Sequence, residues 1–290
     1  MMDQAGRLRE IVDSGPAELQ DKTSQPVIYS VLSGKGGVGK TSLAVNLGIA
    51  LSNLGKKVLV MDADIGMGNV NILLGEVVRH DVMDALTNSR SFREIIVKSP
   101  HGIDIMMGGS ELFGLEQLGT DAQAKIHKSL SVLEEYDIII IDNGAGISRQ
   151  SLAFTILSDE IILITTPEPT AITDAYRVLK LVSLYKLKST VKVVVNQAKD
   201  EKDASGTFDK LCYTTKEFLK LDIERIGSVF SDSRVNRAVM EQVPFAIKYP
   251  NSVAYKGIQA IAGRLVTGTV EVQRVDALKR LSNRILRIFG

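Results

Sequence analysis

The sequence contains a single cysteine, only three histidines, no tryptophan and almost no net charge. Cys212 has no partner for a disulfide or a Cys-x-x-Cys metal site, and the histidines are too widely spaced to form a ligand cluster. A formal net charge of +1 over 290 residues argues against overall attraction to nucleic acid. No apolar run approaches the ~18 residues that span a bilayer, and the polar N-terminus does not resemble a signal peptide. These absences predict a cytoplasmic protein without disulfides and with no specific nucleic-acid partner.

The composition is that of an ordinary folded domain, with 44% apolar and 24% charged residues. β-rich apolar runs alternate with helical patterns, which predicts an α/β fold with a doubly wound, mostly parallel β-sheet flanked by helices. The expected strands are 27–32, 57–62, 103–107, 137–142, 160–165, 191–196 and 223–229. The expected helices are 41–54, 69–74, 81–87, 121–135, 149–157, 171–186, 207–220, 233–241 and 252–266. This pattern divides the chain into an N-terminal segment and linker (1–26), one domain (27–267) and a C-terminal helix (268–290).

A phosphate-binding motif follows the first expected strand. The segment SGKGGVGKTS matches the P-loop pattern G-x-x-x-x-G-K-[ST] and precedes a helical pattern. Small glycines let backbone N–H groups converge on phosphate oxygens at a helix N-terminus, where the helix dipole also favours anions. Lys40 would reach the β- and γ-phosphates, and the Thr41 hydroxyl would ligate Mg²⁺. The predicted nucleotide-binding residues are Gly34, Lys35, Gly36, Gly37, Val38, Gly39, Lys40, Thr41 and Ser42.

Two further apolar strands are expected to end in aspartate residues. The run 138–141 ends at Asp142, in the Walker B pattern, and a buried strand would deliver this carboxylate to the ligand-binding edge of the sheet. There Asp142 could hold Mg²⁺ directly or through a water. The second strand ends in Asp62 and Asp64, which period two places on one side of an extended chain. One of these carboxylates could orient the attacking water, and the alternative is that both cap the following loop.

Lys35 follows the first glycine of the loop, and this position resembles the KGGVGK[ST] motif of the MinD/ParA family of P-loop ATPases. The resemblance implies an ATPase whose ATP, with Mg²⁺, lies between two subunits, with Lys35 reaching the partner's nucleotide. It also implies that Asp64 polarises the attacking water, leaving Asp62 near Mg²⁺. On the residues alone, Lys35 could instead simply add positive potential to the loop.

The base contacts and the second switch segment of the family, residues 142–146 here, depart from this family in part. Asn196 matches the family's adenine-reading asparagine, although it could also be a turn residue at a strand end. The family's Pro-x-Asp motif keeps its aspartate as Asp232 and has Phe230 in place of the proline. Asn143 stands where family members carry Ser or Thr after the Walker B aspartate. We expect the conformational change of this segment to survive the substitution, with an altered rate.

Within the family, the details resemble the flagellar FlhG branch, also called YlxH or FleN. The resemblance lies in the stretches 142–148 and 165–176 and in the N-terminal DQAGRLR. It implies control of flagellar number and placement, and an N-terminal segment that stimulates an FlhF-like SRP-type GTPase. Flagellar switch, C-ring or transcriptional regulator proteins are further possible partners that the resemblance implies. The residues expected to contact the GTPase are Asp3, Gln4, Leu8 and Arg9. The alternative is a disordered tail without function.

The C-terminal segment 270–290 has apolar residues every three or four positions and a basic opposite face. A helix of this kind can lie reversibly on an anionic membrane surface, although a helix packing on the core shows the same period. The residues expected to enter the membrane are Leu278, Leu281, Ile285, Ile288 and Phe289. Two copies in a dimer would add avidity. These features predict a cytoplasmic protein that associates reversibly with the inner face of the membrane.

Other functions remain as alternatives. Division-site MinD shares the nucleotide site and a terminal helix, but it begins almost directly at its first strand. A ParA-type DNA partition ATPase would need a basic surface, which near-neutral charge does not support. Iron–sulfur members need paired cysteines, which a single Cys212 excludes.

Overall fold

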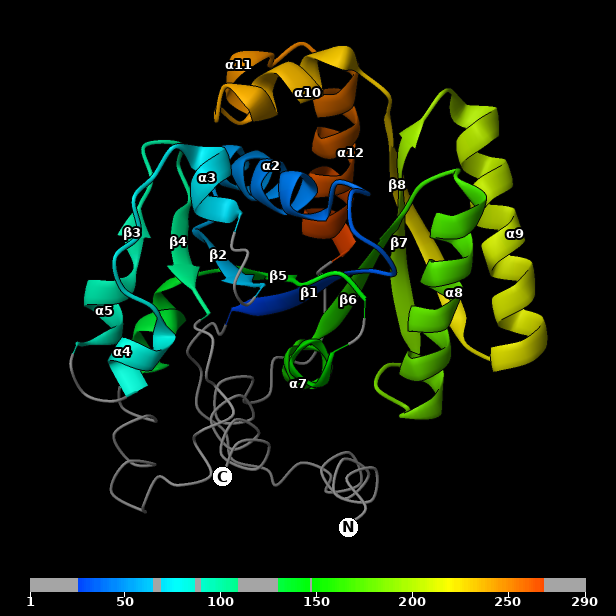
Figure 1. Ribbon diagram of the computed structural model, residues 1–290, viewed down its shortest axis with the longest axis horizontal. Coiled ribbons are helices and arrows are strands. Elements are labelled where there is room, and N and C mark those ends of the chain that lie inside the picture. The colour runs from blue at the N-terminus through cyan, green and yellow to red at the C-terminus, as the bar shows by residue number, and fades with distance from the viewer. Residues whose placement is uncertain (1–25, 65–68, 87–89, 109–129, 147, 269–290) are drawn as a thin grey trace.

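The computed structural model describes residues 26–64, 69–86, 90–108, 130–146 and 148–268 (Figure 1). The described chain forms one eight-stranded sheet with the order β3-β4-β2-β5-β1-β6-β7-β8. All neighbouring strands are parallel except β3 and β4, which confirms the predicted α/β fold. The strands are β1 (Val27–Ser33), β2 (Val58–Ala63), β3 (Val97–Lys98), β4 (Asp104–Met107), β5 (Ile138–Asn143), β6 (Glu160–Thr165), β7 (Thr190–Ala198) and β8 (Asp222–Phe230).

Helices cover both faces of the sheet. In Figure 1, α2, α10, α11 and α12 lie over one face, while α4, α5, α7, α8 and α9 pack on the other. None of the described helices is long and apolar enough to cross a membrane. Their bounds are α2 (Lys40–Asn53), α3 (Val70–Leu74), α4 (Val82–Leu86), α5 (Phe92–Ile95), η2 (Leu130–Glu135, a 3₁₀ helix), α7 (Arg149–Leu157), α8 (Pro169–Leu184), α9 (Glu201–Leu219), α10 (Ser233–Met240), α11 (Phe245–Lys248) and α12 (Val253–Gly268).

The central strand β5 shows how the sequence positions the site. Ile138 and Ile140 belong to the core beneath α2 and α12, while Ile139 and Ile141 belong to the core on the opposite face. Because side chains alternate along a strand, Asp142 faces the α2 side, where the glycine-rich loop ends. The next residue, Asn143, is fully buried and faces the α7 side.

Most expected elements are present, with three differences. The sequence did not predict the short elements β3, α5 and α11. The predicted start of α9 at residue 207 was wrong, because the helix begins at Glu201, where the Asp200 side chain accepts a hydrogen bond from the Asp203 N–H. The described part of the expected 121–135 helix is the 3₁₀ helix η2, and residues 121–129 lie outside the described ranges.

Helix α12 packs against β8 at a glycine, and this close approach is testable. A Cβ on Gly257 would lie 2.5 Å from the Ser228 carbonyl oxygen, so an alanine there must push the helix from the sheet. We expect Gly257→Ala to lower the free energy of unfolding by about 1–3 kcal/mol, as overpacking does. Gly263→Ala in the same helix is the matched control, because its Cβ would meet nothing within 4 Å. Equal urea midpoints for the two variants would contradict this packing.

Candidate functional site

The glycine-rich loop joins β1 directly to α2, which begins at Lys40. Gly37 and Gly39 have φ angles of 80° and 87°, in the left-handed region that glycine adopts without strain. The Leu43 N–H donates to the Gly39 carbonyl at 2.9 Å, so the loop continues straight into the helix. The first N–H groups of a helix have no partner within it and are available to phosphate oxygens. The predicted P-loop therefore has the local geometry of an anion site.

Lys40 forms a buried ion pair with the Walker B carboxylate. Its Nζ lies 2.7 Å from Asp142 Oδ1, and the two side chains are 8% and 1% exposed. Burial raises the pKa of the Asp142 carboxyl, and the Lys40 ammonium opposes this shift. The structure thus brings the predicted phosphate lysine and the predicted metal carboxylate into direct contact.

Two buried oxygen atoms at this site are uncommitted. Asp142 Oδ2 and Ser42 Oγ have no hydrogen-bond partner among the described residues. The Thr41 hydroxyl lies close enough to Asp142 to help lower the pKa of that carboxyl. Carboxylate and hydroxyl oxygens are ligands that Mg²⁺ accepts, and it usually completes its shell with waters and substrate phosphates. The described chain holds no group of three or more His, Cys, Asp or Glu side chains that could bind a metal. The residues present therefore fit a magnesium ion that is bound together with a nucleotide.

The two carboxylates after β2 have different surroundings. Asp62 accepts hydrogen bonds from the N–H groups of Asp64, Asn69 and Val70 at 2.8–3.0 Å. Burial raises the pKa of Asp62, while these hydrogen bonds lower it. Asp62 thus caps the following loop and the start of α3, as in the alternative interpretation, and its role near Mg²⁺ stays a prediction. Asp64 lies against the second switch, because a Cβ on Gly144 would be 3.0 Å from its Oδ1.

Lys35 is held by the start of α8. Its Nζ donates to both Glu168 carboxylate oxygens at 2.8 Å and to Thr170 Oγ1 at 3.0 Å. The hydrogen bond from Lys35 lowers the pKa of Glu168, which is solvent-exposed. Glu168 was not among the predicted site residues, because nothing local in the sequence shows that residues 133 positions apart meet.

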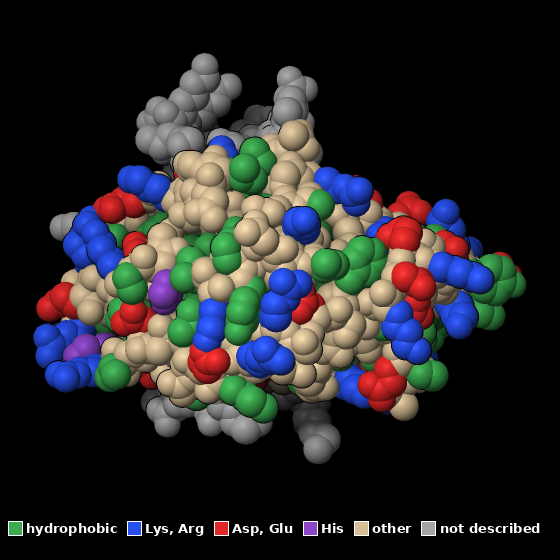
Figure 2. All heavy atoms as spheres, turned by 90° about the horizontal axis from the view of Figure 1, so that it is seen from above, with side chains coloured by type: hydrophobic (Ala, Val, Ile, Leu, Met, Phe, Trp, Pro, Cys, Tyr) green, Lys and Arg blue, Asp and Glu red, His purple; other side chains and the backbone are tan. Residues whose placement is uncertain are grey.

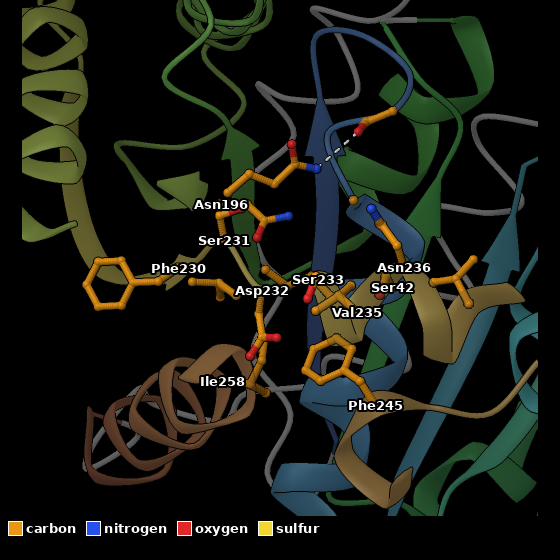
Figure 3. Close-up of a pocket in the computed structure, with 16 residues that line it drawn as sticks. Ser42, Asn196, Phe230, Ser231, Asp232, Ser233, Val235, Asn236, Phe245 and Ile258 are labelled. Atoms are coloured by element: carbon orange, nitrogen blue, oxygen red, sulfur yellow. Dashed lines mark hydrogen bonds between the residues drawn. The ribbon is translucent and has the colours of Figure 1, made fainter. Parts of the chain in front are cut away.

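A cavity of about 570 Å³ opens beside the loop (Figure 3). Asn196 lies on its wall and donates to the Val38 carbonyl at 2.7 Å, while Gln197 donates to the Gly37 carbonyl at 3.4 Å. Adjacent strand residues normally face opposite ways, but a β-bulge and a φ of 58° at Gln197 let both carboxamides face the loop. Gln197 was missed from the sequence, since a bulge leaves no reliable local signal.

The last strand delivers the predicted base contact to the same cavity. Phe230 and Asp232 both line it, and Asp232 caps α10 by accepting from the Arg234 N–H. The Arg234 guanidinium also donates to this carboxylate and lowers the pKa of Asp232 to about 2. Asp232 is therefore ionised and paired at neutral pH. Its role and that of Asn196 in nucleotide binding stay predictions.

The comparisons with known proteins agree with this geometry. A family model described as an AAA domain matches residues 27–195. The flagellum site-determining protein YlxH of Helicobacter pylori is 32% identical over the full length of both chains. The chain belongs to the MinD/ParA family of P-loop ATPases. The antiactivator FleN of Pseudomonas aeruginosa is 30% identical, covering 82% of this chain and 85% of that protein.

A solved structure extends the likeness of this MinD/ParA-family ATPase to three dimensions. The MinC:MinD cell division protein complex of Aquifex aeolicus contains a chain that matches with a TM-score of 0.65 and 27% identity. The match covers 86% of this chain and 99% of that one. The predicted family and the predicted ATPase activity are confirmed. The predicted partner and membrane residues in 1–25 and 269–290 lie outside the described residues, and the three-part division of the chain stays a prediction.

Proposed function

We propose that this ATPase is a dimerisation switch that binds the membrane reversibly and regulates the number or placement of flagella. The observation that carries the proposal is the placement of Lys35 within a complete P-loop, paired with the exposed Glu168 at the N-cap of α8. An exposed ion pair contributes little stability and is easily exchanged. Lys35 can therefore leave Glu168 for the nucleotide of a second subunit at low cost. The flagellar assignment is supported by the likeness to YlxH and FleN.

In this proposal the P-loop lysine exchanges partners when a nucleotide enters. Lys40 leaves Asp142 and binds the β- and γ-phosphates of ATP. Asp142 and Thr41, with Asp62 nearby, would hold Mg²⁺, and the ion would neutralise phosphate charge. Asp64 orients the attacking water, and hydrolysis to ADP separates the dimer. Because Asp64 lies against Gly144, a displacement of the segment after β2 is transmitted to the second switch.

The two terminal segments supply the partners in this proposal. Asp3, Gln4, Leu8 and Arg9 engage an FlhF-like SRP-type GTPase, and the helix carrying Leu278, Leu281, Ile285, Ile288 and Phe289 binds an anionic membrane surface. ADP-bound monomers stay in the cytoplasm, and ATP-bound dimers present two helices to the inner face of the membrane. Flagellar switch, C-ring or transcriptional regulator proteins are further partners in this scheme.

A second candidate is division-site placement, which is supported by 29% identity to the MinD of Bacillus subtilis over 90% of this chain. DNA partition is less well supported, because positive and negative side chains are interspersed on the face shown in Figure 2.

Two truncations of the full chain test the proposal. Removing residues 1–25 is expected to abolish recovery of the FlhF-like GTPase in a pull-down and its stimulation, with ATP hydrolysis unchanged. Removing residues 270–290 is expected to abolish ATP-dependent sedimentation with anionic liposomes, with ATP binding unchanged. Each truncation serves as the control for the other, since each should lose only its own function. Recovery of division proteins in place of flagellar ones would support the MinD alternative. Lipid binding that persists after removal of residues 270–290 would contradict the role of that segment in membrane binding.

A further inference from the structure

One polar side chain that lines the cavity beside the P-loop, Asn236, has no role in the scheme above. Asn236 lies one turn into α10, which begins after the N-cap Asp232. It is exposed and lines the same cavity as Ser42 of α2 (Figure 3). The residue thus comes from the element that follows β8, and Figure 3 shows it beside Ser42 of α2.

The hydrogen-bonding capacity of Asn236 is unused. The other two carboxamides in the cavity, Asn196 and Gln197, already donate to carbonyl groups of the P-loop. The Asn236 side chain makes no hydrogen bond to any residue in the described part of the chain. The Ser42 hydroxyl is buried and also lacks a partner there. A carboxamide offers two donors and an acceptor, and a hydroxyl offers one donor and two acceptor lone pairs. The cavity therefore presents hydrogen-bond donors and acceptors that have no partner among the described residues.

The rest of the site indicates which part of a nucleotide these groups would meet. Lys40 and Thr41, at the start of α2, place the phosphates, and Asn196 is the predicted contact of the base. Ser42 comes next along α2 after the phosphate residues, and Asn236 lines the same cavity. The ribose joins the phosphates to the base and carries two adjacent hydroxyls, each a donor and an acceptor. This chemistry matches a carboxamide.

We propose that Asn236 hydrogen-bonds the ribose hydroxyls of the bound nucleotide and makes the site selective for ribonucleotides over deoxyribonucleotides. This inference rests on the nucleotide site proposed above and names a specificity determinant within it. Removing the hydroxyl that pairs with Asn236 leaves the carboxamide facing the cavity without its ligand partner, and the complex loses one neutral hydrogen bond.

The test compares dissociation constants of the full chain for ADP, 2′-deoxy-ADP, 3′-deoxy-ADP and GDP with Mg²⁺, because diphosphates avoid turnover. The wild-type chain is expected to bind ADP about 3- to 10-fold more tightly than at least one deoxy-ADP, the range of one neutral hydrogen bond. Asn236→Ala should bind ADP more weakly by the same factor and the deoxy-ADP equally well, so that their ratio falls to about one. Arg237→Ala, an exposed neighbour on α10 that does not line the cavity, should keep the wild-type ratio.

Three results would overturn this inference while leaving the nucleotide site in place. They are a wild-type chain that does not distinguish ADP from either deoxy-ADP, an Asn236→Ala variant that keeps the wild-type ratio, and an Asn236→Ala variant that changes the ADP-to-GDP ratio instead, which would make Asn236 a base contact. Lys40→Ala separates this inference from the site itself. If ADP binding depends on Lys40 but the ribose ratio does not depend on Asn236, the nucleotide site stands and only the role of Asn236 fails. A wild-type chain that bound no ADP would overturn both.

Discussion

Replacing Lys40 with alanine is expected to lower kcat/KM for ATP by about 10²–10³-fold or more, the usual cost of losing one donor that stabilises the transition state. The lysine is the first residue of α2, and its side chain is 8% exposed beside Asp142. Steady-state phosphate release and ADP titration measure the effect. Lys256→Ala, an exposed residue on α12, is the control and should leave both unchanged.

The same substitution should also destabilise the nucleotide-free chain. Lys40 Nζ donates to Asp142 Oδ1 in a buried ion pair, and removing one partner of such a pair costs about 3–5 kcal/mol. Without the opposing ammonium, the pKa of Asp142 rises further above its ordinary value of 3.8. A carboxyl whose pKa is higher in the folded than in the unfolded state contributes stability at pH values below its unfolded-state pKa. That contribution is lost as the pH rises through the folded-state pKa.

The variant should therefore be closest to wild type in acid and fall further behind as pH increases. Urea unfolding of both proteins at several pH values measures this difference. Full ATP turnover by Lys40→Ala would contradict the assignment of this segment as a P-loop. If the stability difference between the variant and wild type did not change with pH, the lost pairing with Asp142 would not be its cause.

The parts of the site that could be predicted from the sequence are those in which local pattern determines position. Continuous apolar strands indicated a sheet covered on both faces, and alternation along β5 carries Asp142 to the side of α2. The P-loop could be predicted because its glycines serve a local backbone conformation, with φ of 80° and 87° at Gly37 and Gly39. In these cases the residue type and the backbone geometry are linked within a few positions of the chain.

The parts that could not be predicted depend on distant segments or on irregular backbone. Glu168 reaches Lys35 across 133 positions, and Gln197 faces the loop only because of a bulge and a left-handed φ. Asp62 shows the reverse problem, since a carboxylate at a strand end can serve a metal or cap a loop. Its three backbone hydrogen bonds appear only once the loop is folded. A spacing in the sequence can place two carboxylates together without assigning their tasks.

Replacing Asp64 with alanine is expected to lower kcat by about 10²–10⁴-fold, the range for losing a group that positions or deprotonates the nucleophile. The affinity of this variant for ATP should stay within about threefold of wild type, because the phosphate contacts are assigned to the P-loop residues and not to Asp64. ATP binding without turnover should then accumulate the dimer, measured by light scattering, and hold it on anionic liposomes. Wild-type turnover in this variant would remove Asp64 from the mechanism.

A second variant tests Asp64 through its neighbour without removing the carboxylate. A Cβ on Gly144 would lie 3.0 Å from Asp64 Oδ1, so Gly144→Ala must displace the carboxylate or the second switch by a few tenths of an ångström. Catalysis is sensitive to displacements of this size, whereas binding through the P-loop is not. We expect a smaller fall in kcat than in Asp64→Ala, with ATP affinity unchanged. Since Asp64→Ala removes the group that the new methyl would displace, adding Gly144→Ala to it should lower kcat little further. Additive losses in the double variant would show that Gly144 acts on hydrolysis by a route that does not pass through Asp64.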